Sequence, residues 1–295
     1  MAKYFSLHIF LCLISCKSAQ HDGLSVLREN LYEVVNSAPG TVGVAFLSDR
    51  DTVIINNGVH FPMMSVVKMH QSIAVIDALE KSHGSLDSAL NISTNELDSD
   101  TWSPMLKERG HSDMKVSVRE LMNYAIISSD NNASNLLFSR MVSPAETDKH
   151  IKSMAPDTAF SIRYSEADMK ANHELSYSNY TTPLATSCLI RQLFNSQAVK
   201  YAPLKDALSE VTTGQDRLGA VLEGGSKVQF AHKTGSGYRN DRGELMAFND
   251  VGYFCLPDGR DYALAVFIRD FRGSEAEAAA VMAKISELVY NYVNN

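Results

Sequence analysis

Three short strings of residues carry side chains suited to acyl transfer. They are Ser65-Val66-Val67-Lys68, Ser129-Asp130-Asn131 and Lys233-Thr234-Gly235. A serine hydroxyl is a weak nucleophile at neutral pH, so it needs a nearby amine or carboxylate to take its proton and donors to stabilise the developing oxyanion. If folding brings the strings together, they supply a nucleophile, two amines and several hydroxyl and amide groups.

The first string is predicted to begin a helix. Residues 65–81 lack Gly and Pro and repeat apolar residues at helical spacing. Ser65 and Lys68 then share one helix face, where the amine can reach the hydroxyl. The unpaired N–H groups of the first turn point toward an anion formed at Ser65. Because such a string also arises by chance, it is only a candidate on its own.

The other two strings have settings of their own. Ser129-Asp130-Asn131 lies between the apolar stretches 121–127 and 133–138, which predicts a polar break between two helices that faces a cleft. Lys233-Thr234-Gly235 follows the strand-like residues 228–231, and its small residues are predicted to let a ligand approach the strand edge. An ordinary basic turn is the alternative, but the order of all three strings favours catalysis.

This ordered trio is the signature of class A serine β-lactamases and penicillin-binding proteins. The chain resembles class A β-lactamases over nearly all of its length after the N-terminal leader. Residues 165–169, 232–235 and 248–252 resemble strings of the extended-spectrum, cephalosporin-preferring subgroup. The resemblance implies hydrolysis of β-lactam antibiotics through a serine acyl-enzyme, which confers resistance, with a leaning toward cephalosporins.

The resemblance assigns catalytic roles. Ser65 is the nucleophile, Ser129 passes a proton to the departing lactam nitrogen, and Lys233 supplies positive field. Glu166 positions and deprotonates the water that attacks the acyl-enzyme, although a solvated loop carboxylate is the alternative. Both Lys68 and Glu166 are candidates for the base that activates the serine. The backbone N–H groups of residues 65 and 236 would form the oxyanion hole, at about 3 kcal/mol per donor.

The resemblance also implies a set of substrate-binding residues: Asn131 for the acylamino side chain, Thr234, Gly235 and Ser236 for the carboxylate, Arg217 and Trp102. Arg217 would brace the carboxylate site, with a surface helix arginine as the alternative. Trp102 would form an aromatic wall at the cleft mouth, with a partly buried packing role as the alternative.

The segment around Glu166, residues 163–183, is polar and irregular and is predicted to be a loop. It departs from the majority family pattern. Ala167 replaces a proline, Lys170 replaces an asparagine that helps hold the water, and Asn179 replaces an aspartate that pairs with an arginine, here displaced to Arg163. We therefore expect a differently held loop, a trans peptide after Glu166 and a wider cleft that tolerates bulky cephalosporin side chains.

Composition excludes several classes of function. The chain has 295 residues, 45% of them hydrophobic, and a net charge of −7, with no basic stripe for nucleic acid. None of its nine histidines forms a metal-binding string, so neither a metal nor a cofactor is expected. His232 is predicted to face away from the cleft, and Cys188 and Cys255 to be buried free thiols. A monomer that binds β-lactam small molecules is expected.

The N-terminus carries a predicted export signal. Lys3 precedes the apolar run 4–14, which is too short to span a bilayer. Residues 1–16 are a signal peptide whose last four residues resemble a lipobox, with lipidation at Cys16; cleavage near Ala19 is the alternative. The protein is expected in the periplasm, tethered to a membrane as a lipoprotein if Cys16 is lipidated.

The remaining pattern predicts the fold. Helices are expected over 24–35 and 274–292, and strands over 41–47, 52–55, 228–233, 245–256 and 262–268, with a helical stretch from 65 to about 211. The predicted class is α/β plus all-α, an antiparallel sheet flanked by terminal helices with an inserted helical domain. The α/β domain comprises 17–58 and 213–295, and the helical domain 59–212, with the site at their junction.

Two other functions share the strings. A D,D-peptidase generally lacks the deacylating carboxylate, so Glu166 argues against it. A β-lactam sensor domain becomes acylated without hydrolysis and is joined to membrane-spanning signalling segments. A hydrolytic β-lactamase is the expectation that the residues favour.

Overall fold

A computed structural model describes residues 23–154, 159–222 and 226–295 of the chain. The predicted signal peptide and Cys16 lie outside these residues. None of the helices in the described ranges is long and apolar enough to cross a membrane.

A five-stranded antiparallel sheet forms one half of the molecule, in the order β2-β1-β10-β9-β8. Its strands are β1 (Thr41–Ser48), β2 (Thr52–Ile55), β8 (Gln229–Ser236), β9 (Leu245–Cys255) and β10 (Asp261–Phe271). β8 is an edge strand that pairs with β9 in a register where Lys233 is opposite Val251. The two ends of the chain therefore share one sheet, as predicted.

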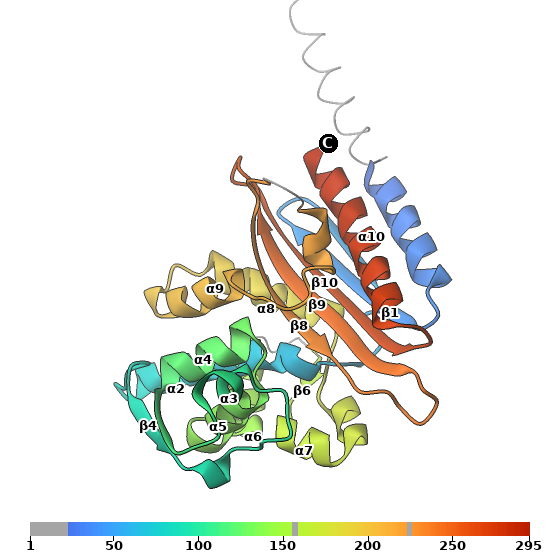
Figure 1. The fold of residues 1–295 in the computed structure, drawn as a ribbon. Coiled ribbons are helices and arrows are strands. Elements are labelled where there is room, and N and C mark those ends of the chain that lie inside the picture. Colours follow the sequence, from blue (N-terminus) through green and yellow to red (C-terminus); the bar gives the residue numbers. More distant parts are fainter. Residues whose placement is uncertain (1–22, 155–158, 223–225) are drawn as a thin grey trace, which may run out of the picture.

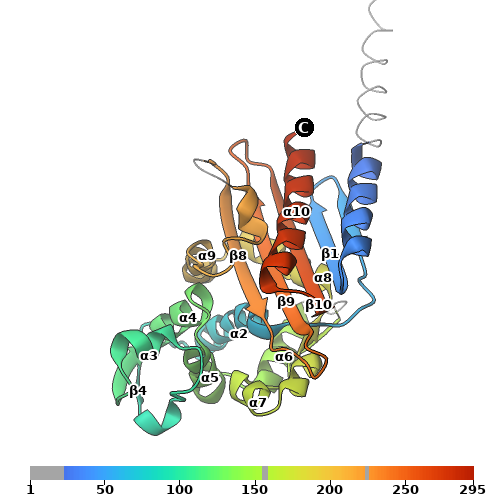
Figure 2. The ribbon, with the colours of Figure 1, turned by 45° about the vertical axis from the view of Figure 1, so that its right-hand side comes forward.

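Two helices cover the outer face of this sheet. Residues 23–37 and α10 (Glu275–Asn294) lie side by side there (Figures 1 and 2). α10 begins at a capping box in which Ser274 and Glu277 pair the free N–H groups of the first turn. Buried apolar side chains such as Phe46, Phe254 and Tyr262 fill the space between sheet and helices.

The other face of the sheet packs on the middle of the chain. α8 (Pro183–Asn195) contacts β1, β9 and β10. Behind it lie helices α2 (Val67–Lys81), α3 (Pro104–Arg109), α4 (Val118–Ile127), α5 (Asn131–Arg140), α6 (Pro144–Met154) and α9 (Ala202–Ser209). α2 is buried on nearly all sides, so polar side chains such as Lys68, His70 and Gln71 are buried together with its apolar ones.

The architecture confirms the predicted fold class, an antiparallel sheet flanked by terminal helices with a helical part inserted between its strands. The inserted part is not purely helical, however. It also contains the short strands β3 (Phe61–Pro62), β4 (Ala89–Ile92), β5 (Met114–Ser117), β6 (Phe160–Ser161) and β7 (Tyr180–Thr181). Strands of two to four residues are too short to produce a recognisable alternation.

Short 3-10 turns account for further differences. They are η1 (Met64–Val66), η2 (Thr94–Glu96), η3 (His173–Ser178), η4 (Val199–Tyr201) and η5 (Leu218–Val221). The predicted helix from residue 65 is therefore η1 followed by α2. The predicted irregular loop 163–183 contains α7 (Glu166–Ala171) and η3, because Ser165 and Asp168 form a capping box that starts a helix.

The two cysteines beyond the leader are free, as predicted, but each is partly exposed rather than buried. Cys188 lies on α8 and Cys255 ends β9. Partial burial raises the pKa of the Cys188 thiol.

Candidate active site

Ser65 lies in the η1 turn, where the edge strand β8 meets the start of α2. A side chain at Gly235 would place a Cβ only 2.5 Å from the carbonyl oxygen of Met63. Glycine therefore lets β8 pack against the turn that carries the serine. The prediction that the small residues of this string let a ligand approach the strand edge, Gly235 among the substrate-binding residues, stays a prediction.

Lys68 is the centre of the site. Its side chain is fully buried, and its Nζ lies 2.9 Å from Ser65 Oγ and 3.1 Å from Glu166 Oε1. It also lies 2.7 Å from Asn131 Oδ1 and 2.8 Å from the carbonyl oxygen of Ser129. An ammonium has three protons for these four oxygens, so its hydrogen bonds hold the serine, the glutamate and the polar break together.

Ser129 connects the two lysines. Its φ is 58°, a left-handed conformation that costs a non-glycine residue about 1 kcal/mol. Its carbonyl accepts from Lys68, while its Oγ accepts from Lys233 Nζ at 3.0 Å. The short break between α4 and α5 thus presents a hydroxyl and a carbonyl to the site at once.

Lys233 is fully buried on β8. Burial holds its pKa well below the usual value for lysine, and the positive charge of Lys68 lowers it further, whereas Glu166 opposes the shift. His232, the preceding residue, contacts Asp250 at 2.9 Å and stacks on Phe230. Because side chains alternate along a strand, this places His232 away from the site, in agreement with its prediction.

Glu166 is the first residue of α7 and is only 6% exposed, so the alternative of a solvated loop carboxylate is wrong. Ser65 Oγ donates to its Oε1 at 3.3 Å. The N–H of Ala167 donates to Asn135 Oδ1 on α5 at 3.2 Å. The Glu166 carboxylate therefore contacts the Ser65 hydroxyl, and its helix α7 is attached to α5 by a hydrogen bond.

The segment before α7 is held by a neutral side chain. Asn179 is fully buried, and its Oδ1 accepts from the N–H groups of Arg163 at 2.8 Å and Tyr164 at 3.0 Å. The Arg163 side chain donates to Ser161 and forms no ion pair with any described residue. No described peptide bond is cis. The loop lacks the ion pair of the majority family pattern, as predicted, and the structure shows that amide hydrogen bonds hold it instead.

The region of β8 implied to bind a carboxylate includes a buried arginine. Arg217 is 6% exposed, which excludes the alternative of a surface helix arginine. Its guanidinium donates to Ser236 Oγ at 2.7 Å and lies over the ring of Phe248 at 3.6 Å. Burial lowers its pKa. Thr234 Oγ1 lies 2.6 Å from Thr213 Oγ1, and this hydrogen bond fixes the position of the Thr234 hydroxyl on β8.

Trp102 stands beside the polar break and is 52% exposed, so it is not the partly buried packing residue of the alternative. Its Nε1 donates to the carbonyl of Ser128 at 2.9 Å, and Lys107 lies over its ring. The N–H of Asn131 donates to the carbonyl of residue 102 at 2.9 Å. An aromatic surface therefore lies next to the residues that contact Lys68.

Asp130 is a supporting residue that the sequence reasoning did not single out. It is fully buried and accepts from Ser103 Oγ, Met105 N and Ala133 N at 2.7–2.8 Å. It caps α5 and fixes the segment that carries the exposed tryptophan. An aspartate immediately before the first residue of a helix is an N-cap signal that could have revealed it.

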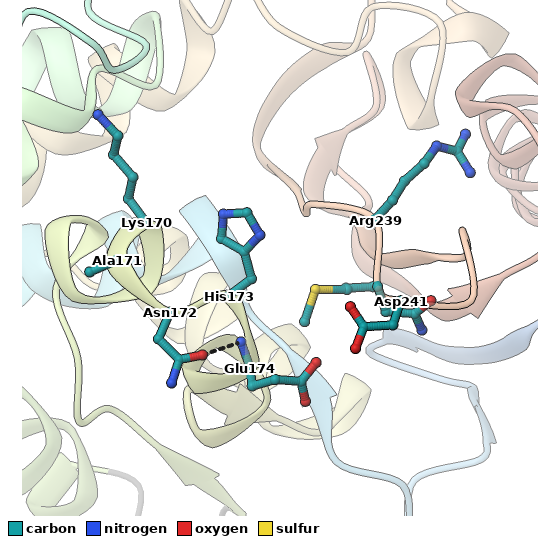
Figure 3. A pocket seen from close by; sticks show the side chains of 9 residues that line it. Lys170, Ala171, Asn172, His173, Glu174, Arg239 and Asp241 are labelled. Atoms are coloured by element: carbon teal, nitrogen blue, oxygen red, sulfur yellow. Dashed lines mark hydrogen bonds between the residues drawn. The ribbon is translucent and has the colours of Figure 1, made fainter.

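A pocket of about 310 Å³ lies beside these residues rather than among them. It is lined by α7, η3 and the connection from β8 to β9 (Figure 3). The ring of His173 stacks on Tyr238 with centroids 3.6 Å apart, which joins the two sides. Within the described ranges, no group of three His, Cys, Asp or Glu side chains could hold a metal ion.

A serine in hydrogen-bond contact with a buried lysine and a glutamate, next to a second lysine that contacts a serine hydroxyl, defines a serine hydrolase site of the acyl-enzyme type. Comparison with known proteins gives the family. A sequence profile of the Beta-lactamase enzyme family matches residues 26–293. A β-lactamase of Phocaeicola vulgatus is 42% identical over 96% of this chain and 92% of its own length.

The extended-spectrum β-lactamase PER-1 of Pseudomonas aeruginosa is 31% identical, over 96% of this chain and 92% of its own length. The crystal structure of TLA-3 extended-spectrum β-lactamase superposes with a TM-score of 0.87 at 29% identity, covering 92% of this chain and 99% of that one. A class A β-lactamase structure from Bacteroides cellulosilyticus gives 0.86 at 30%, covering 92% of this chain and 98% of that one. The chain belongs to the β-lactamase family, in its class A branch.

Proposed function

We propose that this β-lactamase acylates at Ser65 and is deacylated by water that Glu166 activates. The observation that carries the proposal is the position of the Ser65 hydroxyl, which contacts Lys68 Nζ at 2.9 Å and Glu166 Oε1 at 3.3 Å. Either group, Lys68 in its neutral amine form or Glu166 as the carboxylate, is placed to take the serine proton as Oγ attacks the lactam carbonyl. Only the carboxylate, whose helix forms the opposite wall, is left to activate water in the second step.

The proton transfers balance across the two steps. When the lactam C–N bond breaks, the nitrogen takes a proton from Ser129 Oγ, and Lys233, 3.0 Å from that oxygen, restores it. The lowered pKa of Lys233 makes this proton easier to release. The proton that Ser65 gave to its base passes through solvent and returns Lys233 to its protonated form. In deacylation the ionised Glu166 takes a proton from water as the hydroxide attacks the ester carbonyl, and it gives that proton to Ser65 Oγ as the ester C–O bond breaks.

The contacts of Asn131, Thr234, Ser236, Arg217 and Trp102 support their proposed roles around the substrate. Arg217 and the hydroxyls of β8 hold the substrate carboxylate by charge-assisted hydrogen bonds. The backbone N–H groups of Ser65 and Ser236 form the oxyanion hole. A leaning toward cephalosporins is supported by the similarity to PER-1 and TLA-3, which are named extended-spectrum enzymes, and by the unusual anchoring of the loop around Asn179.

Rapid mixing with a chromogenic cephalosporin tests the chemistry. The wild-type enzyme should give a burst of one equivalent or less followed by steady turnover. The Ser65→Ala variant should give neither, and Glu166→Gln should give the burst with steady turnover reduced about a thousandfold, the scale of a lost general base with its positioned water. Steady turnover by Glu166→Gln at the wild-type rate would remove that carboxylate from the mechanism.

The protein's location and assembly form part of the proposal. The leader exports a monomeric enzyme to the periplasm, and lipidation at Cys16 tethers it to a membrane. The two structural parts of the chain, 17–58 with 213–295 and 59–212, act as one enzyme with the site at their junction. Incorporation of labelled palmitate that disappears in Cys16→Ser supports the tether, whereas equal labelling of both proteins contradicts it.

A further inference from the structure

Lys170 lies on the same short helix as Glu166, four residues further along, but its side chain is directed at a different element. Its Nζ lies 2.7 Å from Asp98 Oδ2 and 3.2 Å from Asp100 Oδ2, and it also donates to the carbonyl of Asp100. In Figure 3 its side chain runs away from the other residues around the pocket. Lys170 therefore joins α7 to the segment that precedes Trp102.

That segment is itself attached to α5. The N–H of Asp98 donates to Asn132 Oδ1 at 2.8 Å, and Asn132 Nδ2 donates back to the carbonyl of Asp98 at 2.9 Å. Asn132 is 1% exposed and follows Asn131, whose Oδ1 accepts from Lys68. A continuous set of contacts thus runs from the Glu166 helix through Asp98 to the start of α5 and back to Lys68.

The ion pair is poorly placed to stabilise the fold but well placed to orient α7. The Lys170 and Asp98 side chains are 31% and 37% exposed, and pairs of this kind contribute little to folding. Asp98 raises the pKa of Lys170, so the lysine stays charged. On a helix, residues four apart are neighbours, so the lysine would otherwise be free to pair with Glu166 itself.

We propose that Lys170 is a positioning residue for deacylation: its pair with Asp98 holds α7 against the start of α5, which sets Glu166 over Ser65 and keeps the lysine charge away from that carboxylate. This inference rests on the proposed role of Glu166 in activating water. Displacement of a catalytic group by about 1 Å can cost about a hundredfold in rate. With Lys68 taken as the base for acylation, the effect is confined to the step in which Glu166 activates water.

The test separates the two steps kinetically. Because kcat/KM reports acylation when deacylation limits turnover, slower deacylation lowers kcat and KM together. Lys170→Met should lower both by about tenfold or more, leave kcat/KM within about twofold, and accumulate acyl-enzyme in intact-mass spectra during turnover. Lys170→Arg should keep most of the wild-type kcat, because the guanidinium can still reach Asp98.

Three further variants complete the design. Asp98→Asn should lower kcat at least as much as Lys170→Met does. The double variant Asp98→Asn/Lys170→Met should show no further fall in kcat. Lys284→Met, which removes a lysine paired with Glu287 at 2.8 Å on the distant α10, should behave as wild type.

A wild-type kcat in Lys170→Met, equal losses in kcat and kcat/KM, or no rescue by arginine would overturn the inference. Glu166→Gln is the reference: if it traps no acyl-enzyme, the proposed function fails, whereas trapping there without accumulation in Lys170→Met defeats only this inference.

Discussion

The two walls of the site are held in different ways. The wall formed by α2, the polar break and β8 rests on side chains that water does not reach, since Lys68, Asp130 and Lys233 are all fully buried. The opposite wall, α7, is preceded by an anchor at the buried Asn179, but the helix itself is held by partly exposed contacts, among them the Lys170 pair with Asp98 and the bond from Ala167 to Asn135. The apparatus for forming the acyl-enzyme is part of the core, whereas the helix that carries Glu166 depends in part on contacts near the surface.

The two lysines that represent these walls show the same contrast. Burial and the neighbouring Lys68 lower the pKa of Lys233, while Asp98 raises that of Lys170. Lys233 is buried, where a positive charge is costly but can act on the site. Lys170 is partly exposed and paired with Asp98, so it retains its charge at little cost. Mutations on the two walls should therefore differ in which chemical step they affect and in how much stability they remove.

The largest effect is expected at Asp130. Asp130→Ala leaves three buried donors without an acceptor, so the free energy of unfolding should fall by at least about 3 kcal/mol, and both acylation and deacylation should be lost. Urea denaturation and burst kinetics measure these losses. Asp113→Ala is the control, because that exposed aspartate also accepts two hydrogen bonds from Thr94. Equal destabilisation by the two variants would contradict the contrast between the walls.

Asn179 tests the attachment of the second wall. Asn179→Ala removes the acceptor of two backbone N–H groups at the start of the α7 segment, so Glu166 should lose its position. We expect kcat to fall by about ten- to a hundredfold with kcat/KM changed much less. Stopped-flow kinetics measure the acylation and deacylation rate constants separately. A parallel fall in both rate constants would show that the anchor serves the whole site rather than this wall.

Lys233 gives a pH test for the first wall. Its protonated form supplies the positive field, so kcat/KM should fall as the pH rises through its lowered pKa, well below the 10.5 of a free lysine. Lys233→Arg keeps its charge at high pH, so the alkaline limb should move upward by about one unit or more. A pH profile of kcat/KM for both proteins, with Lys284→Arg as control, decides the point. Coincident alkaline limbs in wild type and Lys233→Arg would assign the limb to another group.

The smallest expected effect is that of salt. Raising NaCl from about 0.1 M to about 1 M shortens the Debye length from about 10 Å to about 3 Å, which weakens exposed ion pairs. Wild-type kcat should fall about twofold, whereas kcat of Lys170→Met, which lacks the pair, should stay constant. An equal response in the two proteins would place the salt effect elsewhere.

Much of this could be predicted from sequence, for physical reasons. The helix of residues 67–81 and the strands at both ends have strong apolar periodicity, so their positions agree with the prediction. The contact of Ser65 with Lys68 follows from their spacing at a helix start. The neutral anchoring of the 163–183 segment followed from the absence of a charge at Asn179.

The rest depends on contacts between distant residues, which periodicity does not encode. The helical start at Glu166 was missed although Ser165 and Asp168 form a capping box. The direction of Lys170 is set by Asp98, far away in sequence. The close packing of Gly235 against the carbonyl of Met63, far away in sequence, was not predicted either.

The most direct test of the central claim is to locate the trapped intermediate. Glu166→Gln is mixed with a cephalosporin, quenched at successive times, digested and analysed by peptide mass spectrometry. The account predicts a drug adduct on the peptide that contains Ser65, which persists long after the wild-type adduct has disappeared. An adduct on another peptide, or one that disappears as fast as in the wild-type enzyme, would contradict it.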